Sequence, residues 1–190
     1  METVVAQTPV AAPPVLVVLA HPVLERSRAN RAMAAAAAGL PGVTVHDLYE
    51  TYPDFLIDVE AEQARLRAVD HVVLQFPLYW YSTPALMKEW IDTVWLYGFA
   101  YGHDGCALAG KTLMAACSAG SPKGDYEPGG AHQYDVAEFL RPLERTAALC
   151  KMHWATSFVL HRSRQINHHD MEIEADRYVA AIRAMVGVTA

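Results

Sequence analysis

The stretch VLVVLAHPVLERSRAN, residues 15–30, decides the fold class. It opens with six apolar residues rich in valine, a pattern typical of a strand that is buried on both faces. A short polar loop follows, and an alanine-rich helix is predicted at 27–38, ended by Gly39 and Pro41. Because a buried strand that leads into a helix through a short loop is the first half of a βαβ unit, these residues predict an α/β protein.

The same alternation of strand and helix continues from this segment to the end of the chain. Further strands are predicted at 43–47, 71–76, 111–117 and 154–160, and further helices at 59–68, 84–97, 134–149 and 170–186. Asp170 is expected to cap the last helix. Five β-α repeats predict one parallel, doubly wound sheet of five strands in the flavodoxin-like order 2-1-3-4-5, with helices on both faces. Ligands bind such sheets at the carboxyl ends of the strands.

Composition, charge and cysteine content narrow the class of protein. The 190 residues are 53% hydrophobic and 19% charged, and the net charge is −6, so a globular protein is expected and nucleic-acid binding is not. Residues 1–14, rich in Ala, Pro and Val, are expected to form a disordered tail, and residues 15–190 a single domain. Three cysteines without a CxxC pair, and no signal-peptide pattern, predict a cytoplasmic protein.

The loop after the first strand, residues 21–30, carries polar groups at the start of a helix. Ser27 and Asn30 lie where a helix exposes its first free N–H groups, and such a helix start binds phosphate. Neither GxGxxG nor GxxxxGKS occurs, which argues against a dinucleotide fold or a P-loop. A helix cap without a ligand role is an equally good interpretation of Ser27 taken alone.

The loop after the third strand carries three adjacent aromatic residues, Tyr79, Trp80 and Tyr81. They are suited to forming a wall for a planar cofactor, although aromatic packing or a subunit interface would use them as well. The loop after the fourth strand is long and glycine-rich, and Tyr126 and His132 within it are candidate proton donors. Loops of this length usually serve a function, and a plain surface excursion is the alternative.

Together with two further segments, these loops resemble the NAD(P)H:quinone oxidoreductase family. The similarity covers about residues 15–160 and rests on HPVLERSRAN at 21–30, YETYPDF at 49–55, FPLYWYSTP at 76–84 and GFAYG at 98–102. It is strongest to the short bacterial branch, which includes ancillary subunits of the glutathione-regulated potassium efflux system. The resemblance implies a flavin cofactor, FMN first and FAD as the alternative, and two-electron reduction of quinone-like acceptors by NAD(P)H.

The resemblance also implies roles for individual residues. Positions that match the family's flavin contacts are His21, Ser27, Arg28, Ala29, Asn30, Leu78, Tyr79, Trp80, Tyr81, Ser118, Ala119, Gly120 and Ser121. The first five match the phosphate side, the next four the isoalloxazine ring, and the last four its pyrimidine edge. Tyr126 and His132 match the family's Tyr and His, which assist charge or proton transfer. The family often has Thr-Thr-Gly-Gly at 117–120, and Ala119 departs from that pattern because it lacks glycine's freedom to adopt positive φ.

Two other functions fit the same residues. The main alternative is a flavin-binding regulatory subunit docked on a membrane potassium transporter. An electron-carrying flavodoxin is a third, disfavoured by the long loop to His132. The apolar helix at 84–97 predicts a homodimer, which the family also implies. A metal site at His168 and His169 is disfavoured, because Asp170 and the acidic residues after it suit a helix start.

Overall fold

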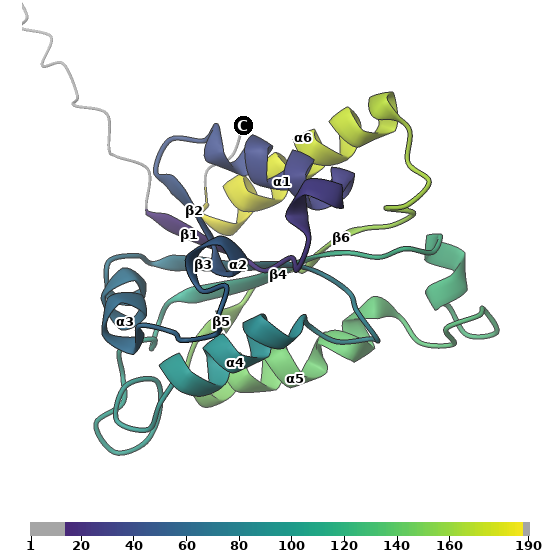
Figure 1. The fold of residues 1–190 in the computed structure, drawn as a ribbon. Coiled ribbons are helices and arrows are strands. Elements are labelled where there is room, and N and C mark those ends of the chain that lie inside the picture. Colours follow the sequence, from purple (N-terminus) through teal and green to yellow (C-terminus); the bar gives the residue numbers. More distant parts are fainter. Residues whose placement is uncertain (1–13, 188–190) are drawn as a thin grey trace, which may run out of the picture.

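A computed structural model describes residues 14–187 and shows a parallel β-sheet between two layers of helices (Figure 1). The sheet contains β1 (Val15–Leu19), β2 (Val43–Asp47), β3 (His71–Pro77), β4 (Thr112–Ser118), β5 (His153–Trp154) and β6 (Phe158–Leu160). The strands run parallel in the order β2-β1-β3-β4-β5, and β6 also pairs with β4. The predicted flavodoxin-like order is therefore confirmed. The predicted tail at 1–14 lies outside the described residues, except for Pro14.

The fifth position of the sheet differs from the prediction, because two short strands replace the single strand that was expected there. β5 pairs with Thr112 and Leu113 at the start of β4, whereas β6 pairs with residues 116–118 at its end. The chain leaves the ladder between them, where Thr156 and Ser157 interrupt the apolar run. Since β6 ends level with β4, the loop after β6 reaches the same edge of the sheet as the loop after β4.

Helices cover both faces of the sheet, as the sequence predicts. α1 (Arg28–Ala38) and α6 (His168–Met185) lie on one face, and α3 (Val59–Arg67), α4 (Ala85–Val94) and α5 (Val136–Leu149) lie on the other (Figure 1). Three short elements do not follow from the sequence patterns: the helix α2 (Leu48–Thr51) and the 3₁₀ turns Leu24–Arg26 and Lys123–Tyr126. Within residues 14–187, no helix has the length and apolar character needed to cross a membrane.

The two faces of β1 explain the unbroken apolar run with which the fold begins. Val15 and Val17 pack with Tyr178 in the core on the α1 and α6 side, whereas Leu16 and Val18 pack in the core on the α4 side. Every residue of β1 is at most 2% exposed. Side chains alternate between the two faces of a strand, so each position must be apolar when helices cover both faces.

The start of α6 corrects one prediction, since Asn167 and not Asp170 is its N-cap. The Asn167 side chain accepts a hydrogen bond from the Asp170 N–H at 2.8 Å and donates one to the Asp170 carboxylate at 2.8 Å. An amide side chain can do both, whereas a carboxylate can only accept. His168 is exposed, with its Nδ1 3.4 Å from Glu172 Oε1. Over residues 14–187, no three His, Cys, Asp or Glu side chains gather in a way that could hold a metal ion.

Candidate active site

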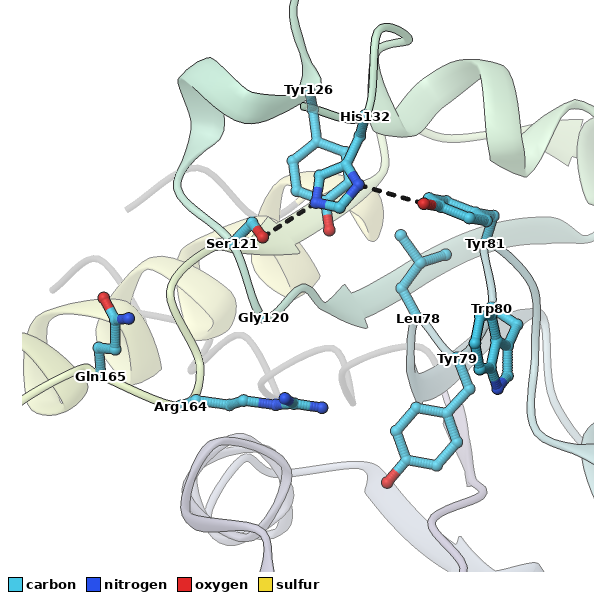
Figure 2. A pocket seen from close by; sticks show the side chains of 10 residues that line it. All are labelled: Leu78, Tyr79, Trp80, Tyr81, Gly120, Ser121, Tyr126, His132, Arg164 and Gln165. Carbon is cyan, nitrogen blue, oxygen red and sulfur yellow. Dashed lines mark hydrogen bonds between the residues drawn. The ribbon is translucent and has the colours of Figure 1, made fainter. Parts of the chain in front are cut away.

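A groove opens at the carboxyl ends of the strands, where the loops after β1, β3, β4 and β6 meet. Its first part, here named the aromatic cavity, measures about 630 Å³, within the range of roughly 300–1,000 Å³ typical of small-molecule sites. This cavity is lined by Leu78, Tyr79, Trp80, Tyr81, Gly120, Ser121, Tyr126, His132, Arg164 and Gln165 (Figure 2). The second part, the polar cavity of about 490 Å³, is lined by His21, Val23, Arg26, Ser27, Arg28, Pro77, Leu78, Tyr79, Ser118, Gly120, Ser163 and Arg164. The two cavities share Leu78, Tyr79, Gly120 and Arg164 as lining residues, so they lie side by side along the groove.

The N-terminus of α1 forms one end of the polar cavity. Ser27 caps the helix, because its Oγ accepts a hydrogen bond from the Asn30 N–H at 3.2 Å. The amides of Arg28 and Ala29 have no partner within the helix, as holds for the first amides of any helix. Arg28 is exposed and forms no ion pair within residues 14–187, while the side chain of Ala29 is buried in the core. Free amides, the helix dipole and a nearby cation together favour an anion such as phosphate.

Asn30 is buried beneath the groove and ties three other elements to α1. Its Nδ2 donates to Ser118 Oγ at 2.9 Å and to Ser27 Oγ at 3.2 Å, and its backbone carbonyl accepts from Gln75 Nε2 at 2.9 Å. Gln75 in turn accepts a hydrogen bond from the Tyr178 hydroxyl on α6 at 3.1 Å. Asn30 therefore supports the groove from below. Its Oδ1 is buried and without a partner in the described part of the chain, so it can still accept a hydrogen bond.

His21 lines the polar cavity as a neutral imidazole. Burial lowers its pKa below the ordinary value of 6.5, although Asp47 and Glu25 act in the opposite direction. Its Nδ1 accepts a hydrogen bond from the Val23 N–H at 3.1 Å, which leaves the proton of the neutral ring on Nε2. Nε2 lies 3.4 Å from the Tyr79 hydroxyl, so His21 presents a hydrogen-bond donor to the groove.

The three aromatic residues after β3 form a strained turn that lines the aromatic cavity. The backbone of Tyr79 pairs with that of Ser82 in both directions at 3.0 Å, and the two residues between them have φ values of 50° (Trp80) and 63° (Tyr81). Two successive left-handed residues are typical of a type I′ turn, in which Asn-Gly is the usual pair. A bulky residue held in this conformation costs roughly 1–3 kcal/mol, so the surrounding structure must impose it. Trp80 is 93% exposed, whereas Tyr81 turns towards His132.

The glycine-rich loop after β4 returns on itself and places His132 over Tyr126. Gly130 is required at this return, since a Cβ there would lie 2.4 Å from the carbonyl oxygen of Gly124. The His132 N–H donates to the Asp125 carbonyl at 2.7 Å, and the His132 and Tyr126 rings stack with centroids 4.4 Å apart at 26° (Figure 2). Burial raises the pKa of Tyr126 above 10, so its hydroxyl stays protonated at neutral pH. The structure thus brings the two candidate proton donors together, one ring on the other.

Among the residues at 118–121, Ala119 alone does not line the groove. Its side chain is buried, its N–H donates to the Leu160 carbonyl at 2.8 Å, and its carbonyl accepts from the Ser163 N–H at 3.0 Å. Because both of its backbone groups are hydrogen-bonded, Ala119 fixes the loop after β4 to β6 and to the loop that follows β6. Its φ is not positive, so the glycine common in the family is not sterically required at this position.

Arg164 lines the groove, although the sequence motifs do not point to it. It follows β6 within HRSRQ at 161–165, is exposed, and lines both cavities. Its side chain extends past Gly120 towards Leu78 and Tyr79 (Figure 2), and it forms no ion pair within residues 14–187. The signal that could have found it is positional, because basic residues directly after a parallel strand lie at the ligand-binding edge.

Comparison with known proteins identifies the family. A family model of the flavodoxin-like fold matches residues 13–184. The chain belongs to this flavodoxin-like family. It is 50% identical over 151 residues to the glutathione-regulated potassium-efflux system ancillary protein KefG of Cronobacter sakazakii. The aligned residues make up 80% of this chain and 82% of that protein. The predicted resemblance to the short bacterial branch is therefore confirmed.

Two solved structures are similar to this chain over nearly their whole length. General stress protein 14 of Treponema denticola, in complex with FMN, is 40% identical with a TM-score of 0.87, over 91% of this chain and 99% of that one. The NADPH-quinone reductase of P. pentosaceus is 34% identical with a TM-score of 0.80, over 90% of this chain and 97% of that one. These similarities confirm the predicted membership of the NAD(P)H:quinone oxidoreductase family.

Proposed function

We propose that this chain is a flavin-dependent NAD(P)H oxidoreductase that reduces quinones or related acceptors by two electrons. The observation that carries the proposal is the groove, in which an anion-binding helix start adjoins an aromatic cavity with a stacked Tyr–His pair. This arrangement fits a cofactor with a phosphate at one end and a planar ring at the other. FMN has this form, and one of the similar solved structures contains it.

The residues that would hold FMN come from all four loops of the groove. Its phosphate would be held by the amides of Arg28 and Ala29, the Ser27 hydroxyl and the guanidinium groups of Arg28 and Arg164. Its ring would lie against the segment that leads into the aromatic turn and against small residues at and after the end of β4: Leu78, Tyr79, Trp80, Tyr81, Ser118, Gly120 and Ser121. FAD is the alternative cofactor, and identification of the extracted flavin separates the two.

When bound, the flavin supplies the hydride chemistry between NAD(P)H and the acceptor. The overall reaction also consumes one proton, since NAD(P)H, H⁺ and a quinone give NAD(P)⁺ and a hydroquinone. The chain supplies this proton at the aromatic cavity, where Tyr126 and His132 carry exchangeable protons. The aromatic turn at 79–81 orients the planar reactants and excludes water from one side of them.

Cofactor extraction and steady-state kinetics test this proposal. The purified protein is expected to contain or take up FMN and to reduce simple benzoquinones with NADH or NADPH. The double variant Tyr126→Phe, His132→Phe is expected to lose about 100-fold in turnover and to keep its affinity for FMN, because only proton supply is removed. A protein that takes up no flavin on reconstitution would refute the proposal, whereas unchanged turnover in the double variant would refute only the role of this pair.

A regulatory subunit of a membrane potassium transporter is the second candidate function. The 50% identity to KefG, an ancillary protein of a potassium-efflux system, favours it. In that role the chain would bind flavin and dock on the transporter, with redox activity secondary. Bound FMN combined with negligible quinone reduction by every donor tested would favour this candidate over the enzyme.

We also propose that the chain works as a homodimer in the cytoplasm. The segment after α4 carries Leu96, Tyr97 and Tyr101, which are 46%, 68% and 36% exposed, an apolar surface that a second copy would cover. Free Cys106, Cys117 and Cys150 suit a reducing compartment. Sedimentation is expected to give twice the chain mass of 20.9 kDa, and a monomeric mass at assay concentration would contradict the dimer.

A further inference from the structure

Two hydroxyl groups from different loops hold the imidazole of His132. Its Nε2 lies 2.9 Å from Ser121 Oγ, in the loop after β4, and its Nδ1 lies 3.3 Å from the Tyr81 hydroxyl, in the turn after β3 (Figure 2). We propose that Tyr81, His132 and Ser121 form a proton chain that leads from solvent to the acceptor oxygen in the aromatic cavity. This inference rests on the proposed reductase function and names the residues that would supply its proton.

Tyr126 cannot be the hydrogen-bond partner of His132 in this arrangement. The two rings are stacked at 26°, whereas a hydroxyl must approach an imidazole nitrogen near the plane of its ring. Both nitrogens of His132 already face hydroxyl oxygens, those of Ser121 and Tyr81. Tyr126, which is 5% exposed, lines the cavity beside this proton chain, and its ring stacks on the imidazole.

The proton chain has a direction because a neutral imidazole has one N–H and one accepting nitrogen. When Tyr81 donates to Nδ1, Nε2–H donates to Ser121 Oγ, and the hydrogen of Ser121 is free to point into the cavity that this residue lines. The Ser121 proton then passes to the acceptor, the Nε2 proton moves to Ser121, and the Tyr81 proton moves to Nδ1. Tyr81 is 46% exposed and regains a proton from water, so one proton enters the chain for each one that leaves.

The strained turn gives a second reason to assign Tyr81 a role. Its left-handed backbone, with φ of 63°, directs the ring back over the groove, where it packs against Phe139 at 4.9 Å between centroids and against His132 at 5.7 Å. A non-glycine residue keeps such a conformation only where the surrounding structure imposes it, and such residues cluster at functional sites. Here the conformation places the phenol oxygen next to His132 Nδ1.

The variants Tyr81→Phe and Ser121→Ala each remove one hydroxyl from the chain. Tyr134→Phe and Ser157→Ala are matched controls outside the groove, and the Tyr134 ring also packs against Phe139. NMR spectra of the full chain labelled with ¹⁵N-histidine, recorded with and without FMN, report how the His132 proton is shared between Nδ1 and Nε2. Both test variants are expected to change this ratio, and both controls to leave it unchanged.

Kinetics at saturating FMN provide the second measurement. Each test variant is expected to lower quinone turnover by about 10- to 100-fold, as the loss of a proton donor does. The double variant should lose no more than the worse single variant, because one interrupted chain cannot be interrupted twice. Additive losses, or an unchanged NMR ratio in both variants, would overturn the proton chain. A wild-type protein that reduces no quinone would count against the proposed function, and the NMR ratio would still decide whether the hydroxyls hold His132.

Discussion

Glu62, on α3, has a fully buried side chain, and its replacement by leucine should destabilise the fold strongly. Its Oε1 accepts a hydrogen bond from the Tyr52 hydroxyl at 2.8 Å, and its Oε2 accepts one from the Trp90 indole at 2.8 Å. His46 Nε2 also lies 2.9 Å from Oε1, and the Arg65 guanidinium lies 3.3 Å from it. The carboxylate thereby joins α3 to β2, to the loop after α2 and to α4.

The size of the effect follows from the partners that Glu62→Leu leaves behind. Leucine keeps much of the volume and the helix propensity, so the loss comes mainly from the buried polar groups of Tyr52, Trp90 and His46. Removing one side of a buried charged cluster costs about 3–5 kcal/mol. Urea unfolding followed by tryptophan fluorescence should therefore show a midpoint lower by about 1.5–2.5 M, for a slope of roughly 2 kcal/mol/M. Glu60→Leu, exposed on the same helix, is the matched control and should shift the midpoint little.

The difference in urea midpoint between wild type and Glu62→Leu should depend on pH, which gives a second check. Burial acts to raise the pKa of Glu62, but the contacts from His46, Trp90 and Tyr52 outweigh it, so the folded pKa lies below 4.5. The stability that the carboxylate provides is therefore complete above pH 4.5 and is lost as the pH falls through the folded pKa. The difference in urea midpoint between wild type and Glu62→Leu should therefore become smaller as the pH falls below 4.5. A midpoint shift below about 0.5 M at pH 7, or a gap that does not narrow, would refute this reasoning.

Arg164→Ala is expected to weaken FMN binding about tenfold in a fluorescence titration, with a smaller loss at high salt, because an unpaired cation facing a phosphate is screened by ions. An equal loss at all salt concentrations would contradict a charge effect. Trp80→Asn should raise the urea midpoint, because asparagine adopts the left-handed conformation at a cost roughly 1 kcal/mol lower. A lower midpoint would show that the turn is not strained. Cys106 is exposed and should react quickly with a thiol reagent, whereas Cys117 should react only after unfolding, since burial raises its pKa to about 12. Mass spectrometry of the labelled peptides distinguishes the two sites.

Much of the fold could be predicted because strands and helices depend on neighbours along the chain. The apolar run of β1 and the Ser27 cap of α1 are local patterns, and both occur in the structure as predicted. The errors arise where two local patterns compete. Asn167 and Asp170 are both good helix caps, and in the structure Asn167 takes the position. The interruption of the fifth strand at 155–157 depends on its pairing with β4, which the sequence does not show.

The candidate site could be predicted in part, because loops after parallel strands meet at one edge of the sheet. That rule located the three predicted loops, and residue chemistry, supported by the family resemblance, singled out Tyr126 and His132 within the longest one. The structure places Ala119 outside the groove, since its backbone pairs with Leu160 and Ser163. Arg164 enters the groove from the loop after β6, which the same rule covers but in which no motif marks a particular residue.

The sequence by itself determined the class of fold, the order of its elements and the edge of the sheet at which the groove lies. These properties follow from the periodicity of burial and from turn residues, which act over a few neighbouring positions. Only the tertiary structure decided which polar groups touch. Ser121 and Tyr81 meet at His132, and four elements meet at Glu62, because strand order and close packing bring distant segments within hydrogen-bonding distance.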